Sequence, residues 1–187
     1  EAIGAHPGLA VRSLPALSAW CKHDPAPDPV WVGDKFDLYI ADAPGCRGHK
    51  EEFSVVIDCG DILSLTYARG IGDAVLDGDA ELTRFMEKYC TKPQQGTRVL
   101  KIDSDDRAAP PVKFEFWPAL VKRLNSIGGT TLTACQGGHG RSGTSMVCML
   151  MVLNEDYSPA DAIIHLRAIH CPRAIESVMQ HEYIGQF

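Results

Sequence analysis

Short apolar runs separated by glycine, proline and acidic residues give the chain its clearest pattern. Apolar or β-branched residues run with little polar alternation at residues 53–59 and 97–102, and shorter runs occur at residues 36–40 and 130–134. A strand that is covered on both faces of a parallel sheet needs no polar face. The pattern therefore predicts four strands, and residues 53–59 suit a strand that is buried on both faces of a parallel sheet.

Apolar residues at helical spacing lie between and after these runs. They predict helices at residues 80–90 and 118–126, the second ending at Gly128, and a central, fully apolar helix at residues 145–153. A further helix is predicted to begin at Ser158, because proline and aspartate follow in its first turn. Strands that alternate with helices are typical of an α/β domain, so we predict a central, mostly parallel sheet flanked by helices.

The start of the chain differs from the rest. Residues 1–30 hold closely spaced prolines at positions 25, 27 and 29, which predicts an irregular arm that lies on the domain. Residues 31–187 are enough for one domain of ordinary size with its own core. We therefore predict a single domain at residues 31–187, preceded by an irregular arm at residues 1–30.

Composition narrows the classes of function. The net charge of −6 is opposite in sign to the basic excess of nucleic-acid binders, and no apolar run is long enough to cross a membrane. The seven cysteines form no CxxC pair and no Cys/His cluster with zinc spacing. We therefore expect no nucleic-acid partner, no membrane span, no metal and a reducing, cytoplasmic location. The oligomeric state stays open.

The segment TTLTACQGGHGRSGT, residues 130–144, carries the candidate chemistry. It places a glycine-rich loop between a predicted strand and a predicted helix, an order in which inward-turned N–H groups and a helix N-terminus bind an anion. Cys135 and Arg141 can then face the same anion as a nucleophile and a planar fork of donors. A lone cysteine is more often a core residue, but a core residue does not require three glycines, an arginine and two hydroxyls beside it. The P-loop of nucleotide hydrolases does not fit, because its pattern requires lysine where Arg141 stands.

The segment CQGGHGRS, Cys135 to Ser142, resembles the C-x5-R-S/T signature of the protein tyrosine and dual-specificity phosphatase superfamily. This resemblance implies a dual-specificity phosphatase-like fold and hydrolysis through a cysteinyl-phosphate, without a cofactor. Cys135 would be the nucleophile, and Ser142 would donate to the departing thiolate. The phosphoryl oxygens would be held by the Arg141 guanidinium and by the N–H groups of Gln136, Gly137, Gly138, His139, Gly140 and Arg141.

The residue before the cysteine departs from the family pattern, which usually has histidine where this chain has Ala134. A thiolate at a helix N-terminus beside arginine has a pKa of roughly 3.5–7.5, against about 8.5 for a free thiol. Without the histidine, we expect the pKa of the Cys135 thiol to lie near the upper end of that range.

The general acid is sought in the loop DSDDRAAPP, residues 103–111. The family places an aspartate four residues before a proline, which selects Asp106 first, with Asp103 second and Asp105 third. A solvated turn is an equally good interpretation of three acids in a loop. The final segment resembles the family's closing segment, so Gln180 is a weaker candidate for positioning water. The alternative is a polar residue on an amphipathic helix.

Substrate class follows from the loop, which contains no lysine. Relatives that act on highly phosphorylated inositides tend to carry lysines there, so the resemblance favours a phosphorylated protein substrate. Two alternatives stay open: a phosphatase of phosphoinositides or RNA 5′ ends, and a catalytically weak module that binds phosphoproteins. Cys59 is a candidate to form a disulfide with oxidised Cys135, and a buried core thiol is the competing interpretation.

Overall fold

The computed structural model describes residues 29–63 and 97–187. The predicted arm and the helix predicted at residues 80–90 therefore lie outside the described residues, apart from the last residues of the arm. The described elements are β1 (Trp31–Val32), β2 (Phe36–Ala41), α1 (Ala43–His49), a 3-10 turn (Lys50–Glu52), β3 (Val55–Asp58), β4 (Arg98–Lys101), α3 (Phe116–Ile127), β5 (Gly129–Ala134), α4 (Arg141–Leu153), α5 (Pro159–Ile169) and α6 (Val178–Gly185).

The strands form one five-stranded sheet in the order β1-β2-β5-β3-β4. β1 pairs with β2 antiparallel, and the other three pairs are parallel. β5 lies in the centre, where Ala134, its last residue, pairs with Ala41 of β2 and Asp58 of β3. The predicted mostly parallel α/β sheet is confirmed, and the three strands end together at the edge where the loop after β5 begins.

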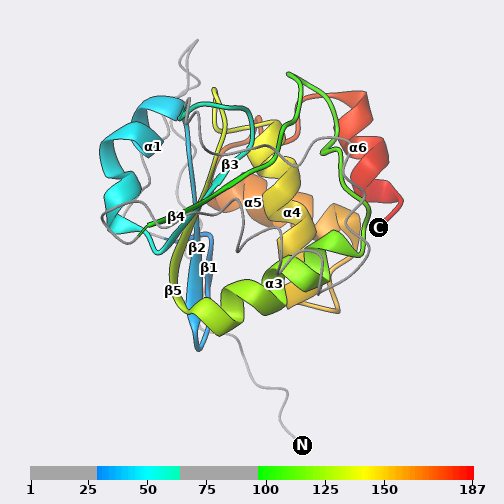
Figure 1. The fold of residues 1–187 in the computed structure, drawn as a ribbon. Coiled ribbons are helices and arrows are strands. Elements are labelled where there is room, and N and C mark those ends of the chain that lie inside the picture. The colour runs from blue at the N-terminus through cyan, green and yellow to red at the C-terminus, as the bar shows by residue number, and fades with distance from the viewer. Residues whose placement is uncertain (1–28, 64–96) are drawn as a thin grey trace, which may run out of the picture.

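Helices cover both faces of the sheet. In Figure 1, α1 lies on one face and α3, α4, α5 and α6 lie on the other. Alternate residues of the central strands accordingly enter two cores: Ile57 of β3 packs in the larger core with α3 and α4, whereas Val56 packs in the smaller core with α1. This double burial explains why the strands were apolar without alternation.

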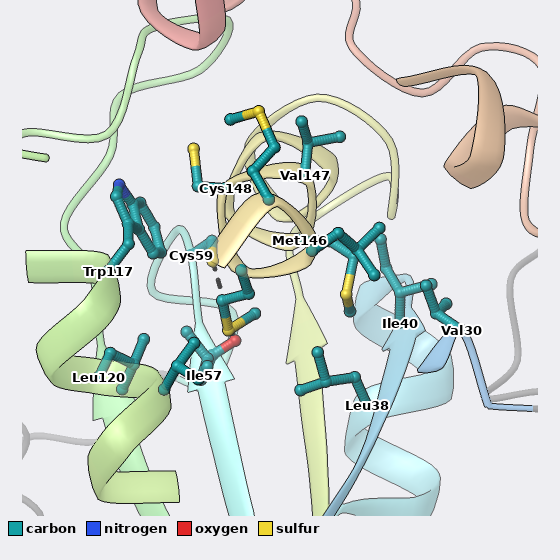
Figure 2. Packing of buried hydrophobic residues seen from close by; sticks show 14 of the residues in the cluster. Val30, Leu38, Ile40, Ile57, Cys59, Trp117, Leu120, Met146, Val147 and Cys148 are labelled. Carbon is teal, nitrogen blue, oxygen red and sulfur yellow. Dashed lines mark hydrogen bonds between the residues drawn. The ribbon is translucent and has the colours of Figure 1, made fainter. Parts of the chain in front are cut away.

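α4 is the central helix of the larger core. Ten of its thirteen residues are buried, from Ser142 to Met151. Figure 2 shows Met146 over Leu38 and Ile40 of β2, while Cys148 lies toward Trp117 of α3. The absence of a polar face in the sequence predicted this burial, and packing fixes the direction in which the helix N-terminus points.

The predicted helix boundaries have local causes. α3 ends at Gly128, whose φ of 76° lies in the left-handed region that favours glycine. α5 begins with a capping box in which Ser158 and Asp161 each accept from the other's backbone N–H. α1 was not predicted, because its sequence APGCRGH has one proline, two glycines and no apolar period; its N-cap is Asp42, whose carboxylate accepts from the Gly45 N–H at 2.8 Å.

Candidate functional site

Cys135 is the first residue of a six-residue loop between β5 and α4. Its side chain is buried, with 2% of the residue exposed, and its Sγ lies 3.1 Å from the Ser142 Oγ in the first turn of α4. The loop therefore begins at the carboxyl edge of the sheet and ends at a helix N-terminus, where unpaired N–H groups and the helix dipole favour an anion.

The carbonyl groups of this loop are bonded to elements that surround it. The Gln136 carbonyl accepts from the Ala43 N–H at 3.3 Å, and the Gly138 carbonyl accepts from His170 Nε2 at 2.7 Å. The His139 carbonyl accepts from the Ile175 N–H at 3.3 Å. These donors come from α1 and from the segment after α5, so the loop is held from two sides.

The direction of the carbonyls determines the direction of the N–H groups. In a trans peptide the C=O and the following N–H point opposite ways, and none of the described peptide bonds is cis. Carbonyls that point outward at residues 136, 138 and 139 therefore turn the N–H groups of Gly137, His139 and Gly140 toward the inside of the loop. The result is a nest of donors beside the Cys135 thiol.

Two glycines of the loop lie close to the groups that support it. Gly138 has a φ of 70°, and a Cβ there would lie 2.9 Å from the Asp42 nitrogen. A Cβ at Gly140 would lie 2.6 Å from Oε2 of Glu176 and 2.9 Å from Nε2 of Gln180. Gly138 is thus required by its left-handed backbone and its close approach to the backbone of Asp42, whereas Gly140 packs against the ends of two side chains.

The Arg141 side chain is oriented by the loops that follow β3 and β4. Its Nη1 donates to the Ser104 carbonyl at 3.3 Å, and its Nη2 pairs with Oδ1 of Asp106 at 3.3 Å. A Cβ at Gly60 would collide with Nη1. Gly60 is itself held by the buried Asp58 carboxylate, which accepts from its N–H at 3.2 Å.

Burial raises the pKa of Asp58, and the three N–H groups that its carboxylate accepts from, those of Gly60, Ile62 and Leu63, oppose that shift. The Asp58 carboxylate therefore holds the turn that leaves room for the Arg141 guanidinium. Sequence reasoning missed Asp58, because a polar residue at a strand end indicates a turn and not the side chain that the turn contacts.

The three candidate acids have different surroundings. Asp106 pairs with Arg141 while its side chain is 78% exposed. Asp103 points toward Lys101, with Oδ1 4.0 Å from Nζ, and is 57% exposed. Asp105 is also exposed. The structure thus brings Asp106 to the arginine of the signature loop and directs Asp103 toward Lys101. The assignment of Asp106 as the general acid stays a prediction.

The N-terminus of α6 holds the backbone of the acid loop. The Ser177 Oγ donates to the Arg107 carbonyl at 2.6 Å, and Gln180 Nε2 donates to the Ala108 carbonyl at 3.3 Å. Farther along, the Tyr183 hydroxyl donates to the Val112 carbonyl at 2.9 Å. One helix therefore sets the course of the loop that carries Asp106.

Gln180 is fully buried. Its Oε1 accepts from the N–H groups of Glu176 and Ser177, at 2.9 and 3.2 Å, and it completes the capping box of α6 with Ser177. These bonds favour a role in holding the loops together. The positioning of a water by Gln180 stays a prediction.

The remaining candidate side chains have simpler roles in the packing. His139 lies beside Glu176, with Nδ1 3.8 Å from Oε1, and burial lowers its pKa. Cys59 is completely buried, its Sγ is 3.4 Å from the Ser145 Oγ, and burial raises its pKa. The environment of Cys59 favours the core-thiol interpretation. Across residues 29–63 and 97–187, no three side chains of metal-ligating type are grouped to hold an ion, and none of the helices there is long and apolar enough to span a membrane.

Comparison with solved structures identifies the fold. The structure of Tk-PTP in its active form matches with a TM-score of 0.56 and 21% identity, over 86% of this chain and 96% of that one. The chain therefore shares the α/β fold of this protein tyrosine phosphatase structure. A kinase-associated phosphatase with its catalytic-site cysteine replaced by serine matches with a TM-score of 0.52 and 18% identity, over 81% of this chain and 84% of that one.

Sequence comparison adds a local match to a curated protein. Cyclin-dependent kinase inhibitor 3 of Rattus norvegicus is 39% identical over 57 residues, which cover 30% of this chain and 27% of the rat protein. The Homo sapiens protein gives the same identity and coverage. The match thus spans about a quarter of these relatives, and no family model matches the chain.

Several residues that support the site could not be found from the sequence. His170, Ile175 and Ser177 are separated from the loops they hold by more than 30 positions, and nothing in their local pattern indicates a partner. The one available signal was the Ser-x-x-Gln capping pattern at Ser177, which predicts a helix start and not the bond to the acid loop.

Proposed function

We propose that this protein is a cysteine-dependent phosphatase that hydrolyses phosphomonoesters on phosphoproteins through a cysteinyl-phosphate intermediate. The observation that carries the proposal is the loop that begins at Cys135 and leads to Arg141. Its carbonyls point outward, so its N–H groups turn inward. Phosphoryl transfer needs chiefly positioning and charge stabilisation, and this arrangement supplies both.

In the first step the Cys135 thiolate attacks phosphorus in line with the leaving oxygen. The S–P bond forms, the P–O bond to the leaving group breaks, and protonated Asp106 gives its proton to that oxygen. The inward N–H groups and the Arg141 guanidinium hold the three equatorial oxygens.

In the second step a water attacks phosphorus, gives a proton to the Asp106 carboxylate and releases inorganic phosphate as the S–P bond breaks. The Ser142 hydroxyl, 3.1 Å from Sγ, donates a hydrogen bond to the departing thiolate. The N-terminus of α4 stabilises the same anion with its dipole. Each turnover thus returns the thiolate and the protonated acid without a cofactor.

The substrate class rests on the chemistry of the loop. The loop offers one Arg and no Lys, so it matches a single monoester better than an inositide that bears several phosphates. Binding of phosphoproteins with little turnover is the second candidate, and Ala134 in place of histidine favours it.

Hydrolysis of a small aryl phosphate separates the two candidates. The wild-type chain should release phosphate and, after rapid acid quench, carry a phosphoryl adduct on Cys135 by peptide mass spectrometry. The Cys135→Ser variant keeps Arg141, so it should bind a phosphopeptide without releasing phosphate. Tight phosphopeptide binding by the wild type with no release and no adduct would favour the binding module.

A further inference from the structure

An open groove lies at the end of α4 that is remote from Cys135. Its volume is about 990 Å³, and it is bounded by β1, the last turn of α4 and α5. β1 contributes Trp31 and Val32, α4 contributes Leu150 and Leu153, and α5 contributes Ile164 and Ile169. Most of the residues that line the groove are therefore aliphatic or aromatic, and none of them belongs to the proposed phosphatase site.

Side-chain bonds hold the walls of this groove in place. His165 of α5 donates from Nε2 to the Val30 carbonyl at 3.4 Å and accepts at Nδ1 from the Tyr157 hydroxyl at 3.3 Å. One neutral imidazole satisfies both bonds, with the proton on Nε2. The bonds connect α5, the turn after α4 and the residue that precedes β1, so they hold the walls of the groove together.

Exposed apolar side chains gather in this groove. Val32 is 67% exposed, Ile164 is 65% exposed and Ile169 is 40% exposed. They are three of the six large apolar residues that are exposed in the part of the chain that the structure describes. Scattered apolar residues are normal on a surface, whereas a cluster around a hollow is typical of a binding site.

The charge around the groove is negative. Asp156 and Asp161 line it, and none of its lining residues is Lys or Arg. The last turn of α4 also ends here, and the carbonyl end of a helix favours cations. The N-terminus of α5 has the opposite polarity, but Asp161 lies in its first turn and offsets it. The groove therefore complements an apolar segment that carries positive charge.

We propose that this groove docks a segment of the phosphoprotein substrate in which two aliphatic side chains lie beside Lys or Arg. The identity of the partner as a substrate rests on the proposed function. α4 has 13 residues and is about 20 Å long, so the docked segment is separated from the phosphorylated residue by at least about six extended residues. Docking raises the local concentration of the phosphoryl group at Cys135 without any new contact there.

Direct binding tests the groove without relying on catalysis. Three fluorescent, unphosphorylated peptides are compared by anisotropy with the full chain: one with two Leu and two Lys, one with the Lys changed to Glu, and one with the Leu changed to Ser. We expect the first to bind at least about tenfold more tightly than either variant, and its affinity to fall with salt. Equal binding of all three, or none, overturns the proposal.

Groove variants separate apolar from electrostatic recognition. Ile164→Asp adds negative charge, which by itself favours a basic peptide, so a loss of binding reports the lost apolar contact. The matched control is Ala160→Asp, an exposed position on α5 that does not line the groove. Asp156→Lys tests the charge, with Glu182→Lys on α6 as its control. Loss in both groove variants and neither control is the expected result, and equal loss in a variant and its control overturns it.

Kinetics connect the groove to the substrate. A phosphopeptide joined to the Leu/Lys segment by about twelve flexible residues should show a KM lowered at least about tenfold, whereas a linker of about three residues cannot reach and should give no gain. Ile164→Asp should abolish the gain and leave aryl phosphate hydrolysis unchanged. If peptide binding holds but no phosphatase activity is found, the proposed function fails and the groove remains. If Ile164→Asp instead dissolves a dimer seen by light scattering, the occupant is a second copy and the substrate proposal is overturned.

Discussion

The signature loop and the acid loop are held in opposite ways. Residues 135–140 begin at a central strand, are bonded to both α1 and the segment after α5, and place Cys135 at 2% exposure. Residues 103–112 are exposed at Asp106, and the described bonds to the carbonyls of Arg107, Ala108 and Val112 all come from α6. One loop is held by the core, whereas the other is held by α6 and by the side chain of Arg141.

This difference separates two kinds of effect. Changes in the signature loop should remove the reaction for every substrate, because attack on phosphorus depends on it. Changes in the acid loop or in α6 should affect mainly those substrates whose leaving oxygen needs a proton. The predictions that follow use this contrast, from the largest expected effect to the smallest.

Cys135→Ser should lower kcat by about a thousandfold or more on all substrates, because a protonated alcohol replaces a thiolate nucleophile. Circular dichroism and thermal melting should show an intact fold, since serine fits the same space. Cys171→Ser, which changes another buried cysteine outside the loop, is the control and should keep activity. Turnover by Cys135→Ser near the wild-type rate would disprove the covalent mechanism.

Arg141→Lys should lower kcat/KM roughly 10²–10³-fold on aryl phosphates, the usual loss for a donor to a transition-state oxyanion. A point charge keeps the sign but cannot span two phosphoryl oxygens or contact the Ser104 carbonyl in the same geometry. The measurement is steady-state kinetics, with Arg167→Lys on α5 as a comparison. Activity within a few fold of wild type would make Arg141 a structural residue.

Asp106→Asn should slow substrates with poor leaving groups by roughly 10²-fold or more and activated aryl phosphates much less, because only the former need general acid catalysis. The slope of log kcat/KM against leaving-group pKa measures this directly. Asp103→Asn, which alters the contact to Lys101, should leave the slope unchanged. A changed slope for Asp103→Asn and an unchanged slope for Asp106→Asn would identify Asp103 as the general acid.

Ser177→Ala should produce a weaker form of the Asp106 phenotype. It removes the bond to the Arg107 carbonyl and also the N-cap of α6, so we expect a stability loss of about 0.5–2 kcal/mol. The leaving-group slope should steepen, whereas the rate with the best leaving group should change less than about threefold. A uniform loss on all substrates would show that α6 acts on the signature loop as well.

His139 should give the smallest effect, visible only in stability against pH. Burial lowers its folded pKa below the ordinary value of 6.5, so the unfolded chain binds the proton more readily. The stability from this group is therefore present above about pH 6.5 and is lost as the pH falls toward the folded pKa. Chemical denaturation between pH 5 and 8 should show a shallower acid loss for His139→Gln than for wild type.

The elements that were predicted correctly are those with a strong local pattern. The strand runs, the apolar α4 and the Ser158 start of α5 each follow from residues within a few positions of one another. β1 and α1 were missed for the same reason, since a two-residue strand and a helix with two glycines carry no periodic signal. Their formation depends on pairing with β2 and packing on the sheet.

The candidate site divides along the same line. The sequence by itself determined the loop chemistry, because strand, cysteine, glycines, arginine and helix start are contiguous from residue 130 to 144. The resemblance to the family's acid loop placed Asp106 before Asp103. The tertiary structure added that Asp106 faces Arg141, while Asp103 faces Lys101. Only the tertiary structure decided which distant groups, His170, Ser177 and Gln180 among them, hold the two loops. Local patterns reflect backbone preferences over a few residues, whereas these contacts depend on how the chain returns to the site after α5.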